Sequence, residues 1–151
     1  EFRRVLFRSL RVITPHLTAI VTVADNGGSS GRLREEFHSL PPGDLRMALA
    51  ALCGDDDWGR SWAEIMQYRF TSSGELNGHA LGNLLLTALW DRDGDPVQGL
   101  DRVGALLKVV GRVLPMALQP LDIEATFRNW EGVHVIRGQK EVAAEIGRAH
   151  V

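Results

Sequence analysis

Residues 17–31 read L-T-A-I-V-T-V-A-D-N-G-G-S-S-G, so an apolar run changes abruptly into acid, amide, glycine and serine. The apolar part, residues 17–24, is rich in β-branched side chains and apolar on both faces, which is typical of a buried parallel strand. We expect residues 25–31 to form the loop after this strand and residues 32–37 to begin a helix. Ligands of open α/β sheets bind at the carboxyl ends of strands, so this loop is the first candidate for a binding site.

Amphipathic helices are predicted downstream of the loop. After a turn at residues 40–44, a helix is expected from Asp44 onward, and further helices at residues 58–69, 78–90 and 97–110. The expected core faces, in chain order, are Leu45, Leu49 and Leu52; the stripe Trp58, Trp62, Ile65, Met66 and Arg69; Leu81, Leu84, Leu85, Ala88 and Leu89, extended around the helix by Leu86 and Trp90; and Leu100, Val103, Leu107 and Val110.

The last third of the chain changes to the period of a strand. Residues 111–115 read as a strand, and apolar residues alternate with polar ones from 121 to 127. A turn at residues 129–132 leads into residues 133–137, which predicts an antiparallel hairpin. The fold class is therefore α/β, with a parallel sheet, covering helices and a short antiparallel hairpin near the C-terminus.

Composition limits the functional class. The chain has 151 residues, 44% of them hydrophobic, and a net charge of −2 with no basic cluster, which argues against a nucleic-acid partner. No apolar run reaches the roughly 18 residues of a membrane span. Its single cysteine, Cys53, can form no intrachain disulfide, which favours a cytoplasmic protein, and its apolar neighbours predict a place in the core.

The two termini are expected to be non-native. Residues 3–9 and 146–151 can both be encoded by one oligonucleotide read in opposite orientations, as in the adapters of sequencing libraries. We therefore divide the chain into adapter-like residues 1–9, a partial domain at residues 10–144 and adapter-like residues 145–151. The ends hold four arginines and two glutamates, so the net charge without them is −4.

The loop after the first strand has the chemistry of a ligand site. Its glycines let backbone N–H groups approach an anion, and the helix start behind it adds positive potential. Asp25 or Asn26 could bind sugar hydroxyls, while Ser29 and Ser30 could donate to phosphate oxygens. The loop matches neither G-x-x-x-x-G-K-[ST] nor G-x-G-x-x-G, so a loop without a ligand is an equal alternative at this stage.

A second candidate is the sequence G-H-A-L-G-N at residues 78–83. His79 and Asn83 are four residues apart and would project from one face of a helix, and the glycines permit close approach of the backbone. The alternative is a capped helix start with a hydrogen-bonded histidine. One histidine with scattered acids is a poor zinc set, so no metal site is assigned.

Other polar residues carry less information. The three aspartates at 55–57 suit a helix start better than a metal cluster. Arginines near predicted loops could each face a phosphate, although each alone is more often a solvated surface group; they are Arg32, Arg34, Arg46 and Arg112. No residue is assigned a catalytic role, because G-x-S-x-G is absent.

Five motifs in a fixed order carry a family resemblance. They are V-T-V-A-D-N-G-G-S-S-G-R-L-R (21–34), L-P-P-G-D-L-R (40–46), Q-Y-R-F (67–70), G-H-A-L-G-N-L-L (78–85) and G-R-V-L-P (111–115). Together they resemble the YvcK-type gluconeogenesis factors. These form a bacterial branch of the superfamily that includes 2-phospho-L-lactate transferase, the CofD-like proteins. The resemblance covers nearly all of residues 17–144.

The resemblance implies a Rossmann-like cytoplasmic protein that binds a UDP-sugar, typically UDP-N-acetylglucosamine. Such proteins support growth on gluconeogenic carbon sources, cell shape and cell-wall metabolism, and act as regulators without an established reaction; a homo-oligomer is compatible with this. The ligand-binding residues implied by the matching motifs are Asp25, Asn26, Gly27, Gly28, Ser29, Ser30, Gly31, Gly43, Asp44, His79, Gly82 and Asn83.

The chain also departs from the family pattern. Asn26 stands where the family usually has a second aspartate, which argues against a metal or proton-transfer role there. The family's first strand and its G-G-G-T-G loop are absent upstream of residue 10, as is the carboxyl-terminal part of its domain. We therefore expect an internal fragment that lacks half of the nucleotide site and is poorly stable alone.

An enzyme is the alternative function. A transferase of the 2-phospho-L-lactate type would need Mg²⁺, and that branch carries an acidic stretch where this chain reads L-P-P-G-D-L-R. One acid instead of two weakens a magnesium site, so the regulator is preferred. No cofactor is expected on the regulator interpretation, and Mg²⁺ is expected only on the transferase one.

Overall fold

The computed structural model describes residues 2–130 and 132–148. The elements, in chain order, are α1 (Phe2–Ile13), β1 (Thr18–Val21), α2 (Gly28–Phe37), α3 (Gly43–Leu52), α4 (Asp57–Gln67), α5 (Leu81–Asp93), α6 (Pro96–Leu107), β2 (Arg112–Pro115), β3 (Glu124–Asn129), β4 (Gly132–Arg137) and α7 (Gln139–Arg148). Residues 1 and 149–151 of the expected adapter-like ends, and Glu131 of the expected turn, lie outside the described residues.

The first strand pairs in parallel with the strand far downstream, as predicted. β1 and β2 are aligned with Ala19 opposite Val113, and α3 contacts both strands while α6 contacts β2. The expectation that both faces of β1 are buried is wrong within the described chain. Ala19 and Val21 are buried, whereas the Ile20 side chain is 69% exposed. β-branched residues favour a strand, but they do not say how many helix layers cover it.

The helix after β1 begins four residues earlier than predicted. α2 starts at Gly28, and the N–H of Gly31 donates to the carbonyl of Gly27 at 2.9 Å, so only residues 25–27 of the expected loop are non-helical. A Cβ on Gly31 would overlap the backbone carbonyl of Asn26. Glycine in this first turn is therefore a packing requirement and not a sign of a loop.

The buried face of α5 is shifted from the predicted core face toward its predicted extension, Leu86 and Trp90. Its buried residues are Gly82, Asn83, Leu86, Thr87 and Trp90, and the leucines predicted to form the core face are at most half-buried. Apolar residues surround this helix almost completely, so their spacing does not select a face. The close approach at Gly82 does, because a Cβ there would lie 2.8 Å from the carbonyl of Met66.

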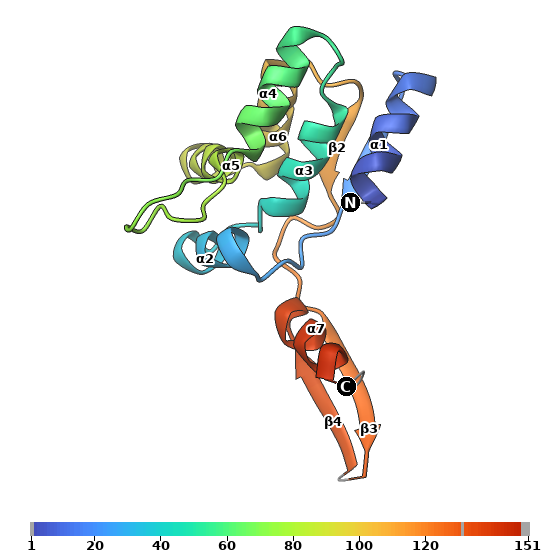
Figure 1. The fold of residues 1–151 in the computed structure, drawn as a ribbon, viewed down its shortest axis with the longest axis vertical. Coiled ribbons are helices and arrows are strands. Elements are labelled where there is room, and N and C mark those ends of the chain that lie inside the picture. The colour runs from blue at the N-terminus through green and yellow to red at the C-terminus, as the bar shows by residue number, and fades with distance from the viewer. Residues whose placement is uncertain (1, 131, 149–151) are drawn as a thin grey trace.

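The predicted core faces of α3 and α6 are largely buried, whereas that of α4 is only partly so, because Met66 is buried but Trp58 is 44% and Ile65 is 36% exposed. Leu45, Leu49 and Leu52 of α3 are buried, as are Leu100, Val103 and Leu107 of α6, and Cys53 is 2% exposed. Asp56 accepts the N–H of Gly59 at 2.7 Å and caps α4, so this aspartate belongs to a helix start. In Figure 1, α4, α5 and α6 lie on the side of α3 away from α1.

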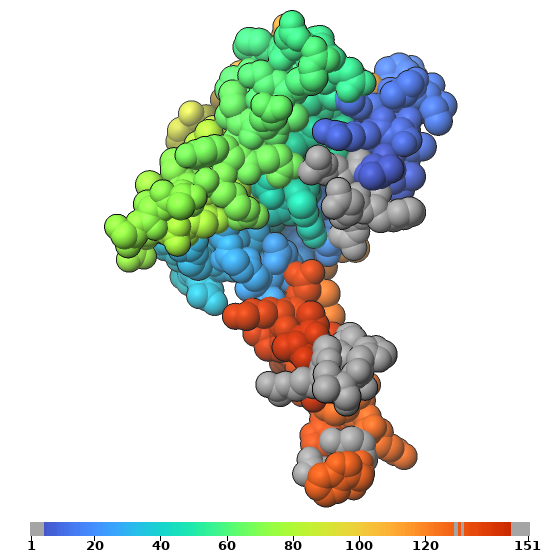
Figure 2. All heavy atoms as spheres, in the orientation of Figure 1, coloured from blue at the N-terminus to red at the C-terminus, as the bar shows by residue number. Residues whose placement is uncertain are grey.

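The C-terminal residues form an arm that extends from the body (Figures 1 and 2). We use "arm" for β3, β4 and α7, and "body" for the elements from α1 to β2. The antiparallel hairpin is confirmed, with Ala125 opposite Ile136 and Phe127 opposite His134. No expectation was made for α7, which contacts both strands of the hairpin.

Candidate functional site

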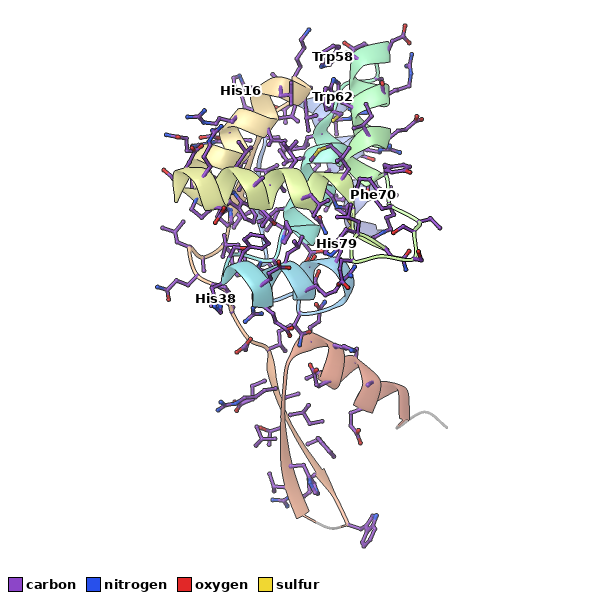
Figure 3. All side chains as sticks on the ribbon, turned by 90° about the vertical axis from the view of Figure 1, so that its left-hand side faces the viewer. His16, His38, Trp58, Trp62, Phe70 and His79 are labelled. Carbon is purple, nitrogen blue, oxygen red and sulfur yellow. The ribbon has the colours of Figure 1, made fainter. Side chains whose placement is uncertain are left out.

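Three helix starts meet just after β1. The first turn of α3 lies against the β1–α2 segment, because a Cβ on Gly43 would lie 2.9 Å from Asp25 Oδ2 and would overlap Ser30 Oγ. His79 precedes α5 and lies between α5 and α2, as Figure 3 shows. Segments that are 50 residues apart in sequence therefore converge beside the carboxyl end of a parallel strand.

The short turn before α2 is held by Asp25. Its Oδ1 accepts the N–H of Gly27 at 2.9 Å, and Gly27 occupies the N-cap position of α2 without a side-chain hydrogen bond to the helix. Gly28 has φ +50°, which favours glycine. Because no side chain caps the first turn of α2, its N–H groups suit an anion or an oxygen acceptor.

Four buried polar side chains form a chain of hydrogen bonds under these helix starts. Ser29 Oγ lies 3.0 Å from His79 Nδ1 and 2.9 Å from Asn83 Nδ2. Arg46 Nε donates to Asn83 Oδ1 at 2.8 Å, and Arg46 Nη1 donates to Gln67 Oε1. We call Arg46, Asn83, Ser29 and His79 the polar chain. It joins α2, α3 and α5 through side chains that are at most 6% exposed.

His79 and Asn83 meet in a different way from that expected. The helix begins after His79, since Ala80 is the N-cap of α5, so the two side chains are not neighbours on a helix face. They converge because both bond to Ser29 Oγ. The structure thus brings together residues from both candidate motifs of the sequence.

Asn26 lies apart from the polar chain. Its Nδ2 donates to Glu141 Oε2 at 2.8 Å, and its Oδ1 accepts the N–H of Lys140 at 2.9 Å. This hydrogen bond from Asn26 lowers the pKa of Glu141. Asn26 therefore connects the loop to the start of α7, whereas Gly31 and Gly82 serve close packing. Asp44 lies in the first turn of α3 and does not cap it, because the N-cap is Pro42.

Arg46 and His79 differ in charge at neutral pH. Burial, followed by the nearby Arg69, lowers the pKa of Arg46 to about 10, against the opposing effect of Asp44 and Asp25. Arg46 is therefore still a cation at neutral pH. The pKa of His79 is lowered first by burial and then by Arg32, which favours a neutral imidazole.

Arg46 and Gln67 are the residues that sequence reasoning placed least well. Of the four arginines considered as phosphate ligands, Arg46 alone is buried, at 3% exposed. The others have partners elsewhere: Arg32 with the carbonyls of Glu75 and Asn77, Arg34 with Asp122 and Arg112 with Asp101. The helical spacing from Leu45 and Leu49 is the signal that could have placed Arg46 on an inward face.

Two pockets lie away from the predicted ligand residues. One, of about 230 Å³, lies between α6 and β2 and includes Asp101, Lys108 and Arg112. The other, of about 270 Å³, includes His38 and Trp90. None of the predicted ligand residues lines either pocket.

Comparison with known proteins decides the family. The family model described as 2-phospho-L-lactate transferase CofD matches residues 3–151. The chain belongs to the CofD family. Its resemblance to gluconeogenesis factors and its mixed α/β fold are thereby confirmed, while the proposed division at residues 9 and 145 stays a prediction.

Similar proteins share most of this chain. A Mycobacterium leprae protein, provisionally named a gluconeogenesis factor, is 53% identical over 148 residues, which are 95% of this chain and 41% of the relative. The gluconeogenesis factor of Listeria monocytogenes is 42% identical over 130 residues, which are 86% of this chain and 39% of the relative. The crystal structure of a Bacillus halodurans protein matches with a TM-score of 0.83 and 37% identity, over 94% of this chain and 44% of that one.

This chain therefore spans about two fifths of the length of the curated relatives it matches. It is a homologue of the gluconeogenesis factors, a name that several of these relatives carry. Within the described residues, no helix is both long and apolar enough to cross a membrane.

Proposed function

We propose that this protein is a cytoplasmic regulator that binds a nucleotide-sugar of the UDP-N-acetylglucosamine type and supports gluconeogenic growth, cell shape and cell-wall metabolism. Its kinship with proteins named gluconeogenesis factors supports the metabolic part. Asp25, Ser30, Gly43 and the backbone N–H groups of the first turn of α2 supply the ligand groups of this chain, and the rest of the binding site is expected from other parts of the complete gene product.

One observation carries the proposal. The first turn of α2, which no side chain caps, lies at the carboxyl end of β1 and beside the first turn of α3. Helix N-termini carry partial positive charge, and the buried Arg46 cation adds to it. This combination suits the negative charge of a diphosphate, while the carboxylate of Asp25 suits a sugar hydroxyl.

A transferase is the second candidate, and the description of the matching family model favours it. Asp25 and Asp44 are carboxylates near the helix starts, and the negative charge of each raises the pKa of Arg46. Mg²⁺ is often held by one or two carboxylates together with substrate phosphates, so these two residues fit such a role. The ion would neutralise charge on the transferred group.

Calorimetric titration of the complete gene product with UDP-N-acetylglucosamine, with and without Mg²⁺, separates the two candidates. For a regulator, we expect binding that is independent of the metal, with the nucleotide-sugar recovered intact. Asp25→Ala should weaken binding by about tenfold or more, because a hydrogen bond to a polar ligand group is lost. Turnover or a strict need for Mg²⁺ would establish the transferase instead.

A matched control keeps folding apart from binding. Asp91→Ala changes an exposed residue of the same type as Asp25, in the last turn of α5 and away from the helix starts. Thermal unfolding of each variant shows whether it is folded at the temperature of the titration. If Asp25→Ala and Asp91→Ala bind the nucleotide-sugar equally well, the helix starts after β1 are not the site.

A further inference from the structure

The hydroxyl of Ser29 has all of its bonding capacity in use. A serine hydroxyl offers one proton and two lone pairs. Ser29 Oγ lies 2.9 Å from Asn83 Nδ2, 3.0 Å from His79 Nδ1 and 3.4 Å from the backbone nitrogen of Ala80. The Ala80 N–H can only donate, so the direction of the other two hydrogen bonds depends on Asn83.

Arg46 decides how the amide of Asn83 is oriented. A guanidinium group has donors and no acceptor. Arg46 Nε lies 2.8 Å from Asn83, so the atom facing it has to be the oxygen Oδ1. Asn83 Nδ2 then faces Ser29 and donates to Oγ. Both lone pairs of Ser29 Oγ are thereby occupied, by Asn83 and Ala80.

The remaining hydrogen bond has only one direction. With both lone pairs occupied, Ser29 has to donate its proton to His79 Nδ1, at 3.0 Å. We propose that Arg46 and Asn83 are positioning residues, which act through Ser29 to hold His79 as the neutral tautomer protonated at Nε2. His79 then offers a single N–H donor, without a positive charge, at the start of α5.

The surroundings of His79 agree with a neutral ring. Burial and the charges of Arg32 and Arg69 lower its pKa, and Glu36 is the opposing charge. The buried side-chain atoms without a partner in the described residues are Arg11 Nε and Thr87 Oγ1, so His79 Nε2 is not one of them. No hydrogen bond to Nε2 is found among the described residues, so this nitrogen keeps some contact with solvent although His79 is only 6% exposed.

The ligand part of this inference rests on the proposed function. A fixed Nε2–H donor suits an acceptor oxygen, such as a phosphate or carbonyl oxygen of a nucleotide-sugar. Histidine protonated at Nδ1 alone would present a lone pair from Nε2 and would repel that oxygen. Arg46 thus affects ligand recognition in two ways. It supplies a positive charge, and by orienting Asn83 it fixes, through Ser29, the tautomer of His79.

Selective ¹⁵N labelling of histidine in the complete gene product tests the tautomer directly. Two-bond ¹H–¹⁵N correlation spectra distinguish the two neutral tautomers from the charged ring, and His79→Gln identifies the signal. At pH 7.5 we expect His79 to be protonated at Nε2 only. A proton on Nδ1 in the unmodified protein would overturn the proposal, whatever any variant does.

Asn83→Asp is the sharpest variant, since it changes hydrogen bonding with little change in shape. A carboxylate accepts from Arg46 and pairs with its charge, but it cannot donate to Ser29. Ser29 then donates to the carboxylate, and His79 Nδ1 must become protonated. A ring that stays bare at Nδ1 in a folded Asn83→Asp variant would overturn the proposal. Asn77→Asp, outside the polar chain, is the matched control.

The ligand is tested separately, with UDP-N-acetylglucosamine as the probe. Asn83→Asp should lower its affinity by about tenfold or more, because a donor to the ligand is replaced. Unchanged affinity with a changed tautomer would remove the ligand part and leave the positioning roles. Absence of binding in the unmodified protein would overturn the proposed function, while the tautomer measurement would stand on its own.

Discussion

The body and the arm are built on different principles. In the body, polar side chains from three helices bond to one another while buried, and Leu86 and Leu107 are fully enclosed. In the arm, Trp130 is 90% exposed and Val135 is 56% exposed. Long-range packing therefore determines the body, whereas cross-strand pairing between near neighbours determines the arm.

A few hydrogen bonds connect the two regions. Asn26 bonds to Lys140 and Glu141 at the start of α7, and Arg34 bonds at 2.6 Å to Asp122 in the segment that leads from β2 to β3. Asn26 immediately follows Asp25, so one loop serves both the predicted ligand site and the attachment of the arm. Because long-range packing holds the body and local strand pairing holds the arm, we expect substitutions in the body to destabilise the whole fold and substitutions in the arm to act locally.

The largest difference is expected between two apolar truncations. Leu86→Ala in the body removes a side chain that is 0% exposed and should lower the free energy of unfolding by about 2–5 kcal/mol. Val135→Ala in the arm should change it by no more than about 0.5 kcal/mol. Urea unfolding of the complete gene product measures both. Equal losses would show that the arm is covered as thoroughly as the body.

The next effect concerns glycine. Gly31→Ala places a methyl group against the carbonyl of Asn26, and such overpacking should cost about 1–3 kcal/mol. Gly74→Ala is the matched control, because no atom lies within 4 Å of its added Cβ. The same unfolding measurement applies. A neutral Gly31→Ala would mean that the Gly/Ser segment is a yielding loop, as the sequence alone suggested.

The strands and the helices differ in how well the sequence predicts them. β1, β2 and the hairpin were predicted because apolar alternation and β-branched residues report strands locally. The first turn of α2 was missed, because glycine and serine are poor helix formers and the contact with Asn26 requires glycine only at position 31. The buried face of α5 was predicted only in its extension, Leu86 and Trp90, because leucines surround that helix and the close packing at Gly82 selects the face.

The candidate site was predictable in its members but not in its connections. Ser29, His79 and Asn83 are the residue types that a polar site needs, and two motifs supplied them. The spacing from Leu45 and Leu49 could have placed Arg46 on an inward face, but the acceptors that a buried cation requires, from Asn83 and Gln67, were not predictable because their positions depend on the whole fold. The bond from Asn26 to α7 was not predictable for the same reason, because its partner lies 115 residues away.

The link between the regions should produce a smaller, local effect. Asn26→Ala removes the hydrogen bonds to Lys140 and Glu141, each worth about 0.5–1.5 kcal/mol. Hydrogen exchange of the α7 amides should become faster by up to about tenfold, while the α3 amides keep their rates. Asn77→Ala, an exposed asparagine in another loop, is the control. Faster exchange throughout the body would contradict a local attachment.

The smallest effect is expected from exposed ion pairs, where the body and the arm should behave alike. Glu124 lies opposite Arg137 in the hairpin and bonds to it at 2.7 Å, while Asp101 bonds to Arg112 in the body at 2.6 Å. All four side chains are at least 43% exposed. Glu124→Gln and Asp101→Asn should each lower the free energy of unfolding by about 0.2–1 kcal/mol.

Salt and pH then separate charge from packing. Both losses should shrink at 1 M salt, where the Debye length falls to about 3 Å. The hydrogen bond from Arg112 lowers the pKa of Asp101 below its ordinary value of 3.8. The stabilisation of the fold by the Asp101–Arg112 ion pair is therefore present above pH 3.8 and is lost as the pH falls through the folded-state pKa of Asp101. A large loss for Glu124→Gln alone that disappears at 1 M salt would mean that charge, and not strand pairing, holds the arm together.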